Sequence, residues 1–379
     1  LGDPNKAYYE EGVGGLLSYH RWSQWLSAQF PDGVYHGEDA KINDFTASIP
    51  DHILEQVVAP AAARGKTVVV LAEEWHTTGA VAALARAVSR AGLNDRCLIL
   101  WNANNIFGFE AIDWQALRQS CAITTVSRYM KHLMVERGIN PLVVPNGIPS
   151  RWLEAVDYQQ TQGLRKALPG LLLAKVGRYH PDKRWGMAME AVGHLKRLGL
   201  KPKMLVRGSN DPYRVAVIEK AFEQGLNWSE IHLDHPSMRQ ILTEIRRHQD
   251  ADILELKFFV PEDFLRVANA AADMVLANSI HEPFGLVGLE VMACGGVAVT
   301  GSSGEDYAHS FMNCLRIDSD DAREIVVYIQ DLLSHPETSQ DIRSRGQLTA
   351  SLFVWELVTQ ELFRKIEFVA QLRGVRIHG

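Results

Sequence analysis

Cysteine is scarce in this sequence. The 379 residues include only four cysteines, Cys97, Cys121, Cys294 and Cys314, and no pair has the Cys-x-x-Cys spacing of metal-binding or redox motifs. Small secreted domains that depend on disulfides are much richer in cysteine. We therefore expect a reducing location, the cytoplasm, and we expect Cys294 in "MACGG" to pack as a small apolar residue.

Long apolar runs and an excess of positive charge are also missing. The longest uncharged apolar runs, such as "TVVVLA", are far shorter than the roughly 20 residues of a membrane-spanning helix. No signal peptide is visible. The formal net charge of −6 argues against a generic surface for nucleic acid or anionic membranes, although a peripheral membrane contact stays open. The sequence begins with Leu1 rather than Met, so residue 1 need not be the start of the gene.

The sequence does contain a regular alternation of strand-like and helix-like segments. A chain of this length predicts two domains. Buried parallel strands typically show continuous runs of Val, Ile and Leu. In the first half we predict strands over 66–74, 96–102 and 122–126, and helices over 14–29, 79–92 and 127–138. This pattern indicates an α/β domain with a parallel sheet.

A polar stretch over 156–170 interrupts the alternation. We predict a linker there, because it has few β-branched residues and ends in Pro-Gly. The alternation then resumes with predicted strands at 171–177, 203–208, 230–233, 256–260, 273–279, 296–300 and 314–317, and helices at 185–198, 212–224, 236–248, 261–271, 286–294, 321–334, 336–350 and 353–372. We therefore expect two doubly wound, Rossmann-like domains, residues 1–155 and 156–355, whose parallel sheets face an interdomain cleft.

The segment "HEPFGLVGLE" (281–290) places Glu282 and Glu290 on either side of an uncharged run. We predict that a strand ends near Ala277, that Glu282 lies in the following loop, and that a helix begins around Phe284–Gly285. The first amides of that helix have no intrahelical partner, and a glycine would let a phosphate approach them closely. Two glutamates at this spacing are weak evidence alone. In a strand–loop–helix setting they predict a nucleotide-sugar site, with carboxylates for sugar and ribose and amides for the diphosphate.

A second loop, in "AKVGRYHPDKRWG" (174–186), follows the first predicted strand of the second half. Gly177 permits a tight turn, and Arg178 and Lys183 could both reach an anionic diphosphate, Arg through a two-pronged contact and Lys as a mobile charge. The alternative is a solvated basic loop that Asp182 partly neutralises. Considered together with the 281–290 segment, this loop is better explained as a diphosphate site.

These stretches, with "FVPEDFLRVANAAADMVLANS" and "VVPNGI", resemble the retaining glycosyltransferases of the GT-B fold, family 4, which include sucrose-phosphate synthases and, more distantly, glycogen synthases. The resemblance implies that Arg178 and Lys183 bind the donor diphosphate, Glu282 the donor sugar and Glu290 the ribose. It implies main-chain contacts to sugar and phosphate at Phe284, Gly285, Leu286 and Val287, and a contact of the base with Val260. It further implies that the C-terminal helix, about 356–379, completes the first domain.

In the first half the resemblance covers less of the sequence. "EGVGG" (11–15) is similar to a glycine-rich loop of the family that approaches donor and acceptor, which implies Gly14 and Gly15. "EEWHT" (73–77) resembles "HDWHT" of the synthase branches and implies His76 on the acceptor side, although a loop histidine with a structural role is the alternative. Where the family often has a histidine, this chain has "NANN" (102–105), so Asn104 takes its place on the acceptor side. The strand expected before "EGVGG" is missing.

The expected activity is therefore transfer of a hexose, with retention, from a nucleotide-diphosphate sugar to a hydroxyl of a sugar, polysaccharide or lipid-linked acceptor. Glu282 would position the sugar rather than attack it, and the leaving diphosphate would be stabilised electrostatically. We expect no cofactor and no metal, because "DSD" (318–320) precedes a helix and is more typical of capping than of metal binding. A GT-B epimerase or hydrolase, or an inactive nucleotide-sugar-binding protein, remains the alternative. The base, the acceptor and the oligomeric state are left open.

Overall fold

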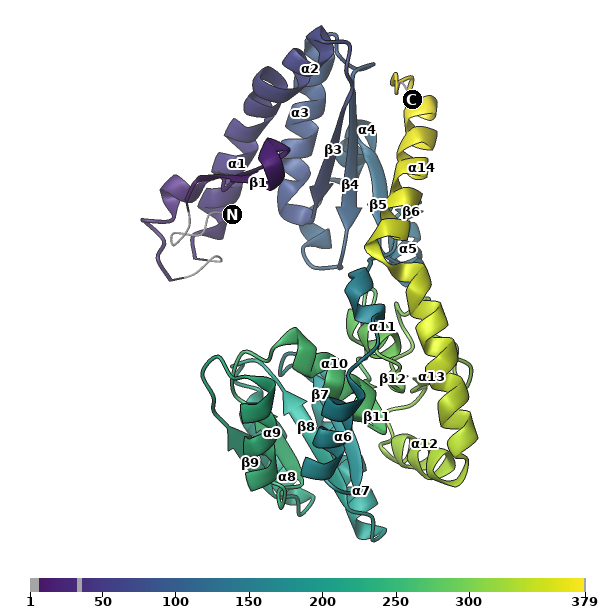
Figure 1. Ribbon diagram of the computed structural model, residues 1–379. Helices are drawn as coiled ribbons and strands as arrows, with labels where there is room; N and C mark the ends of the chain where they lie inside the picture. The colour runs from purple at the N-terminus through teal and green to yellow at the C-terminus, as the bar shows by residue number, and fades with distance from the viewer. Residues whose placement is uncertain (1–6, 33–35, 378–379) are drawn as a thin grey trace. The chain divides into compact units, whose positions relative to one another are not determined.

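The computed structural model describes residues 7–32 and 36–377, and they form two compact units (Figure 1). The first unit contains residues 1–126, 130–144 and 361–379, and the second contains residues 127–129 and 145–360. Among the described residues, no helix is both long enough and apolar enough to cross a membrane.

The first unit is built on a four-stranded parallel sheet in the order β3-β4-β5-β6. Its strands are β3 (Val68–Glu73), β4 (Cys97–Ala103), β5 (Ala122–Thr125) and β6 (Leu142–Val143). Its helices are α1 (Glu38–Ile53), α2 (Ala59–Ala63), α3 (Thr78–Arg90), α4 (Trp114–Ser120) and α5 (Arg128–Val135). The predicted strands 66–74, 96–102 and 122–126 are thus confirmed, as are the helices predicted over 79–92 and 127–138, whereas α4 was not predicted.

The final helix, α14 (Trp355–Arg373), contributes to the core of this unit. Its residues Ile366, Val369 and Ala370 pack against Leu98 and Leu100 of β4. An uninterrupted apolar strand such as β4 has side chains on both faces of the sheet, so it needs helices on both faces.

The predicted helix over 14–29 is wrong. Two short strands, β1 (Tyr9–Gly12) and β2 (Leu17–His20), pair antiparallel in a separate two-stranded sheet. Gly14 and Gly15 have φ values of +62° and +75°, a left-handed conformation that reverses the chain and suits glycine. The hairpin strands are almost entirely exposed, so no apolar face drives this segment to form a helix.

The second unit contains a seven-stranded, wholly parallel sheet in the order β13-β12-β11-β7-β8-β10-β9. Its strands are β7 (Leu171–Val176), β8 (Pro202–Arg207), β9 (Trp228–Ile231), β10 (Ile253–Leu256), β11 (Met274–Ala277), β12 (Ala298–Thr300) and β13 (Leu315–Arg316). Its helices are α6 (Tyr158–Ala167), α7 (Trp185–Arg197), α8 (Arg214–Glu223), α9 (Met238–Arg247), α10 (Glu262–Ala271), α11 (Leu286–Ala293), α12 (Arg323–Ser334) and α13 (Pro336–Ala350).

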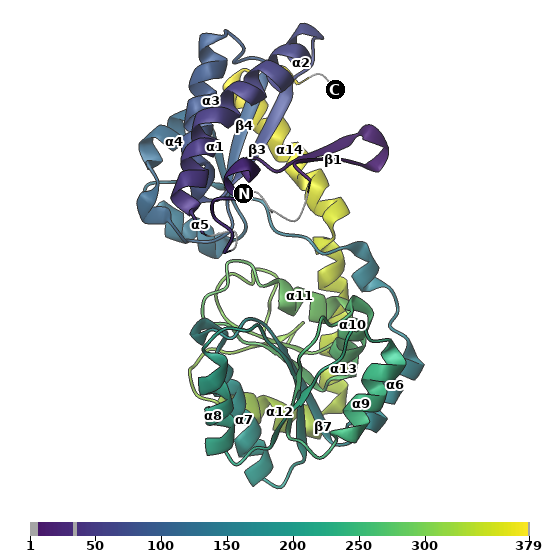
Figure 2. The same ribbon diagram turned by 90° about the vertical axis from the view of Figure 1, so that its left-hand side faces the viewer.

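Helices cover both faces of this sheet. Figure 2 shows α7, α8 and α12 on one face and α6, α9 and α10 on the other. On the α7 face, one buried cluster joins Leu173, Val206 and Leu276 of the strands to Trp185 of α7 and Ile325 of α12. The predicted α/β fold with parallel sheets is confirmed.

The predicted linker over 156–170 is a helix instead. Asp157 caps α6 by accepting a hydrogen bond from the Gln160 amide, at 3.0 Å. Leu164 and Ala167, three positions apart, are buried, and the rest of the helix is largely polar. A narrow apolar stripe on a polar surface helix resembles a linker in sequence.

The strand predicted over 256–260 is shifted. The strand β10 ends at Leu256, so Phe259 and Val260 lie in the following loop. β10 contains Glu255, which is completely buried and accepts hydrogen bonds from Tyr179 (2.9 Å) and Arg214 (3.0 Å). A charged residue that the fold neutralises in this way interrupts the apolar run by which a buried strand is usually identified.

Candidate functional site

Two loops of the second unit meet at the point where the strand order of its sheet reverses. From the neighbouring strands β7 and β11, the chain continues to β8 on one side and to β12 on the other. Loops that follow the carboxyl ends of such strands form the usual ligand site of a doubly wound sheet. The loop after β7 runs over 177–184 and the loop after β11 over 278–285, and a hydrogen bond from the Ile280 amide to the Asp182 carbonyl (2.8 Å) joins them.

Lys183 and Glu282, one predicted from each of these two loops, form an ion pair in the structure. About a quarter of each side chain is exposed. The main chain of Glu282 is held from the other side, because its amide donates to the Ser303 hydroxyl at 2.8 Å and its carbonyl accepts from the Gly304 amide at 2.8 Å. The Glu282 carboxylate therefore has a defined position and a cation beside it.

Gly285 caps the helix α11 in a left-handed conformation, with φ of +81°. The predicted helix start near 284–285 thus lies one or two residues early. The amides of Leu286 and Val287, in the first turn, have no intrahelical acceptor. The side chain of Phe284 is buried and packs against Tyr307 and Phe353, so only its main chain is available to a ligand.

Glu290 lies one turn further along α11, and its pKa is raised to about 7. Burial is the main cause, because it disfavours the charged carboxylate, and the charge of Glu262 adds to it. Within the described part of the chain, the Glu290 carboxylate has no hydrogen-bond or ion-pair partner.

A cavity of about 400 Å³ adjoins the loop after β7. It brings together Gly177 and Arg178 with Val260, which the sequence places 82 positions beyond Arg178. Its other lining residues are Trp152, Val176, Arg207, Ser209, Phe259, Glu262 and Leu265. Glu262 is already paired with Arg151 by hydrogen bonds of 2.6 and 2.8 Å. No described carboxylate forms an ion pair with Arg178, so this guanidinium is available to an anion.

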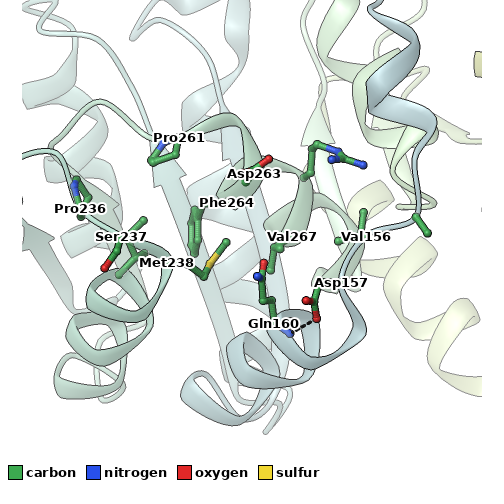
Figure 3. Close-up of a pocket in the computed structure, with 13 residues that line it drawn as sticks. Val156, Asp157, Gln160, Pro236, Ser237, Met238, Pro261, Asp263, Phe264 and Val267 are labelled. Carbon is green, nitrogen blue, oxygen red and sulfur yellow. Dashed lines mark hydrogen bonds between the residues drawn. The ribbon is translucent and has the colours of Figure 1, made fainter.

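A second cavity, of about 410 Å³, lies among α6, α9 and α10 (Figure 3). Phe264, Met238 and Val267 form part of its wall. Its polar groups include Asp157 and Ser237, which already cap α6 and α9. None of the predicted site residues lines it, so it is separate from the two loops.

The residues predicted on the acceptor side lie in the first unit. His76 follows β3 in a short 3-10 turn, and burial lowers its pKa. Asn104 follows the neighbouring strand β4, where its side chain donates to Glu73 at 2.9 Å and its amide donates to Glu74 at 3.0 Å. Gly14 and Gly15 lie in the turn of the hairpin instead, outside the parallel sheet. The structure therefore places His76 and Asn104 at adjacent strand ends but does not place the two glycines with them.

Three charged residues at the two loops were not predicted. Glu305 is buried behind Gly285, and burial raises the pKa of its carboxyl to about 7. Arg184, at the end of the first loop, contacts Asp320 at 2.9 Å but keeps its buried Nε and Nη1 atoms without partners. Lys175 is buried beneath both loops. For Lys175 the available signal was a charged residue inside an apolar strand.

The "DSD" segment has no metal-binding arrangement around it. No group of three or more His, Cys, Asp or Glu side chains that could hold a metal is found in residues 7–32 and 36–377. The helix α12 begins at Arg323, after the segment, and its N-cap is Ala322. The prediction that "DSD" itself caps this helix is therefore wrong. Glu324 of the helix accepts hydrogen bonds from the amides of Asp318 and Ser319 instead, both at 3.0 Å.

The family model "Glycosyl transferases group 1" matches residues 159–349, which make up half of the chain and include both loops. The chain belongs to the glycosyl transferases group 1. A comparison with curated proteins found no match.

Solved structures of other glycosyltransferases share the fold of this family member. Anabaena HepE in complex with UDP has 17% sequence identity and a TM-score of 0.62, with 82% of this chain and 81% of that chain covered. Sucrose-phosphate synthase from Thermosynechococcus elongatus has 16% identity and a TM-score of 0.62, covering 97% and 87%. The UDP-forming trehalose-phosphate synthase from Burkholderia xenovorans has 12% identity and a TM-score of 0.67, covering 98% and 92%. The fold is thus that of the GT-B glycosyltransferases.

Proposed function

We propose that this group 1 glycosyltransferase transfers a hexose, with retention, from a nucleotide-diphosphate sugar to a hydroxyl acceptor. The observation that carries the proposal is the ion pair of Lys183 and Glu282 beside the free amides at the start of α11. A cation, a carboxylate and main-chain amides lie together at the carboxyl ends of the strands. They match the phosphate and hydroxyl groups of a nucleotide-diphosphate sugar.

The leaving diphosphate would be stabilised by fixed positive groups. Arg178, Lys183 and the first amides of α11 would take up the negative charge that develops on it, and donors oriented in advance do this without reorganisation. Glu282, held by Lys183 and by its own main chain, would position the sugar. The diphosphate could itself accept the proton of the acceptor hydroxyl, so no protein nucleophile is required.

The remaining predicted residues would hold the nucleoside and the acceptor. Glu290 would bind the ribose, and Val260, which lines the 400 Å³ cavity, would contact the base. The first unit would be the acceptor side, with His76, Asn104 and the glycines Gly14 and Gly15. The reaction would need no metal and no other cofactor. UDP is the first nucleotide to test, because HepE has been solved with UDP and with UDP-glucose.

Thermal-shift measurements with UDP, GDP and ADP test donor binding, because a ligand that binds only the folded state raises Tm. A rise with one of the three supports the proposal, and no rise with any of them contradicts it. Sugar release must then depend on an added acceptor. Hydrolysis at the same rate without acceptor would favour a hydrolase, and interconversion of the donor sugar would favour an epimerase. NMR of the anomeric proton in the product tests retention.

A further inference from the structure

The ammonium group of Lys175 is buried directly beneath the two loops. Lys175 lies near the end of β7 and is 2% exposed. Its Nζ donates to the carbonyl of Leu276, on the neighbouring strand β11, at 3.1 Å. It also donates to the side-chain oxygen of Asn278, in the loop that follows β11, at 2.6 Å. The Trp185 ring centroid lies 5.1 Å away. Lys175 therefore ties the start of the Glu282 loop to the strand that precedes the Arg178 loop.

This buried cation has no carboxylate partner among the described residues. Lys183 and Arg184, at the start of α7, oppose its charge, and Glu282 is the neighbouring anion that favours it. Glu255, the buried carboxylate of β10 in the same sheet, is engaged by Arg214. Burial, then Lys183 and Arg184, lowers the pKa of Lys175 to about 7. A buried ammonium that no carboxylate contacts directly is unfavourable, so a further anion bound above it would stabilise it.

We propose that Lys175 is a positioning residue that supplies a buried counter-charge for the donor diphosphate and takes up a proton when the donor binds. It does not touch the ligand but acts through Asn278 and through its charge. The proton comes from the solvent and adds to the Nζ lone pair, so no other reactant is needed. The inference rests on the proposed function, because it requires an anion at the two loops.

Proton linkage gives the expected pH dependence. If the donor raises the pKa of Lys175 above its value in the free protein, the complex binds more protons than the free protein between these two pKa values. The dissociation constant should then rise by up to about tenfold per pH unit above pH 7. Below pH 7, Lys175 is protonated in both states and contributes no slope.

Isothermal titration calorimetry of UDP, GDP and ADP at pH 8 tests the inference on the intact chain. Titrations in PIPES, HEPES and Tris, whose ionisation enthalpies differ, give the number of protons exchanged on binding. For wild-type protein we expect uptake approaching about 0.9 proton per bound nucleotide, the fraction of Lys175 that is neutral one pH unit above its pKa.

The matched variants are Lys175→Met and Lys203→Met. Lys203 is a lysine of the adjacent strand β8 whose Nζ also donates to a main-chain carbonyl, that of Ala251 at 2.9 Å, away from the two loops. Glu290 and Glu305 also titrate near pH 7, so the difference between wild type and Lys175→Met isolates the lysine. We expect Lys175→Met to abolish most of the uptake and to weaken binding about tenfold at pH 6, and Lys203→Met to behave as wild type.

The outcomes separate the inference from the proposed function. Nucleotide binding without proton uptake in the wild type, or with equal uptake in Lys175→Met, overturns the inference and leaves the function standing. Failure of all three nucleotides to bind contradicts the function, and the inference falls with it. The wild-type measurement requires no variant, so the absence of proton uptake there overturns the inference even if Lys175→Met does not fold.

Discussion

A side chain on Gly285 would collide with Glu305, because a Cβ built at Gly285 lies 2.6 Å from the Cγ of Glu305. The same glycine has a left-handed φ of +81°, and its carbonyl accepts a hydrogen bond from the Tyr307 hydroxyl. The N-terminus of α11 is therefore positioned by a glycine that is fixed by both its conformation and its neighbours.

Gly285→Ala is expected to destabilise the protein by about 1–3 kcal/mol, through backbone strain and overpacking. It should also weaken nucleotide binding, because the α11 amides would move. Gly186 of α7 is the control, because a Cβ added there would meet no atom within 4 Å, so Gly186→Ala should be neutral or stabilise by up to about 1 kcal/mol. Urea unfolding measures both variants, and equal stabilities would refute the proposed constraint.

Removal of Lys183 should lower the rate more than it lowers stability. Lys183→Met is expected to reduce kcat by about two to three orders of magnitude, as the loss of one transition-state donor does. Because Lys183 and Glu282 are paired, the double variant with Glu282→Gln should cost less than the sum of the two single changes. Steady-state kinetics of all three variants, with Lys203→Met as control, measure this coupling. Strictly additive losses would mean that the pair does not act together.

The Glu290 carboxyl should make stability depend on pH. Its pKa in the folded protein, about 7, is above the value of 4.5 for an unperturbed glutamate, so between these pH values the folded state binds more protons. Stability should therefore fall as pH rises from about 4.5 to 7, by about 1–3 kcal/mol. Glu290→Gln should remove this contribution, and Glu244→Gln, at a partly exposed position of α9, should not. Differential scanning calorimetry across this range measures the difference.

The pair of Arg214 and Glu255 is predicted to be critical for stability. Glu255 is completely buried, so Arg214→Met leaves its charge with only the more distant ammonium of Lys257, at 3.9 Å, and should cost about 3–5 kcal/mol. Arg247→Met breaks the exposed contact of Arg247 with Glu244 and should cost less than about 1 kcal/mol. Similar midpoints in guanidinium unfolding for the two variants would contradict the predicted importance of this pair.

Chelation is expected to leave activity unchanged. We propose that the positive charges of Arg178 and Lys183, rather than a metal ion, stabilise the diphosphate. Removing metals with EDTA should therefore alter kcat by less than about twofold. Dialysis against EDTA followed by assays with and without added Mg²⁺ or Mn²⁺ measures this. A loss of activity that either metal restores would contradict the assignment.

Most elements of the second unit could be predicted from the sequence because their apolar runs and glycines reflect simple local requirements. The run at 171–176 is buried on both faces of the sheet, and Gly285 is required by its positive φ. These are the same features that located the loop of Glu282. Predictions of this kind need only one segment of sequence at a time.

Several of the features that were missed depend on partners that are distant in sequence. The bounds of β10 were predicted wrongly because Glu255 interrupts its apolar run. Only the folded chain brings Arg214 and Tyr179 to this carboxylate. Lys175 and Glu305 resembled solvated charges in the sequence, and their burial results from how the strands and loops pack. The assignments of Gly14, Gly15, His76 and Asn104 stay predictions, because an acceptor site is specific to its substrate.

The position of α14 determines how the chain can be divided for experiments. The first unit takes its residues from both ends of the sequence, and Ile366 and Val369 close the core over Leu98 and Leu100. A fragment that ends at residue 144 would expose this patch to water and should aggregate. Fusing residues 361–379 behind residue 144 through a flexible connector should give a soluble fragment. The first unit could then be purified and studied by itself.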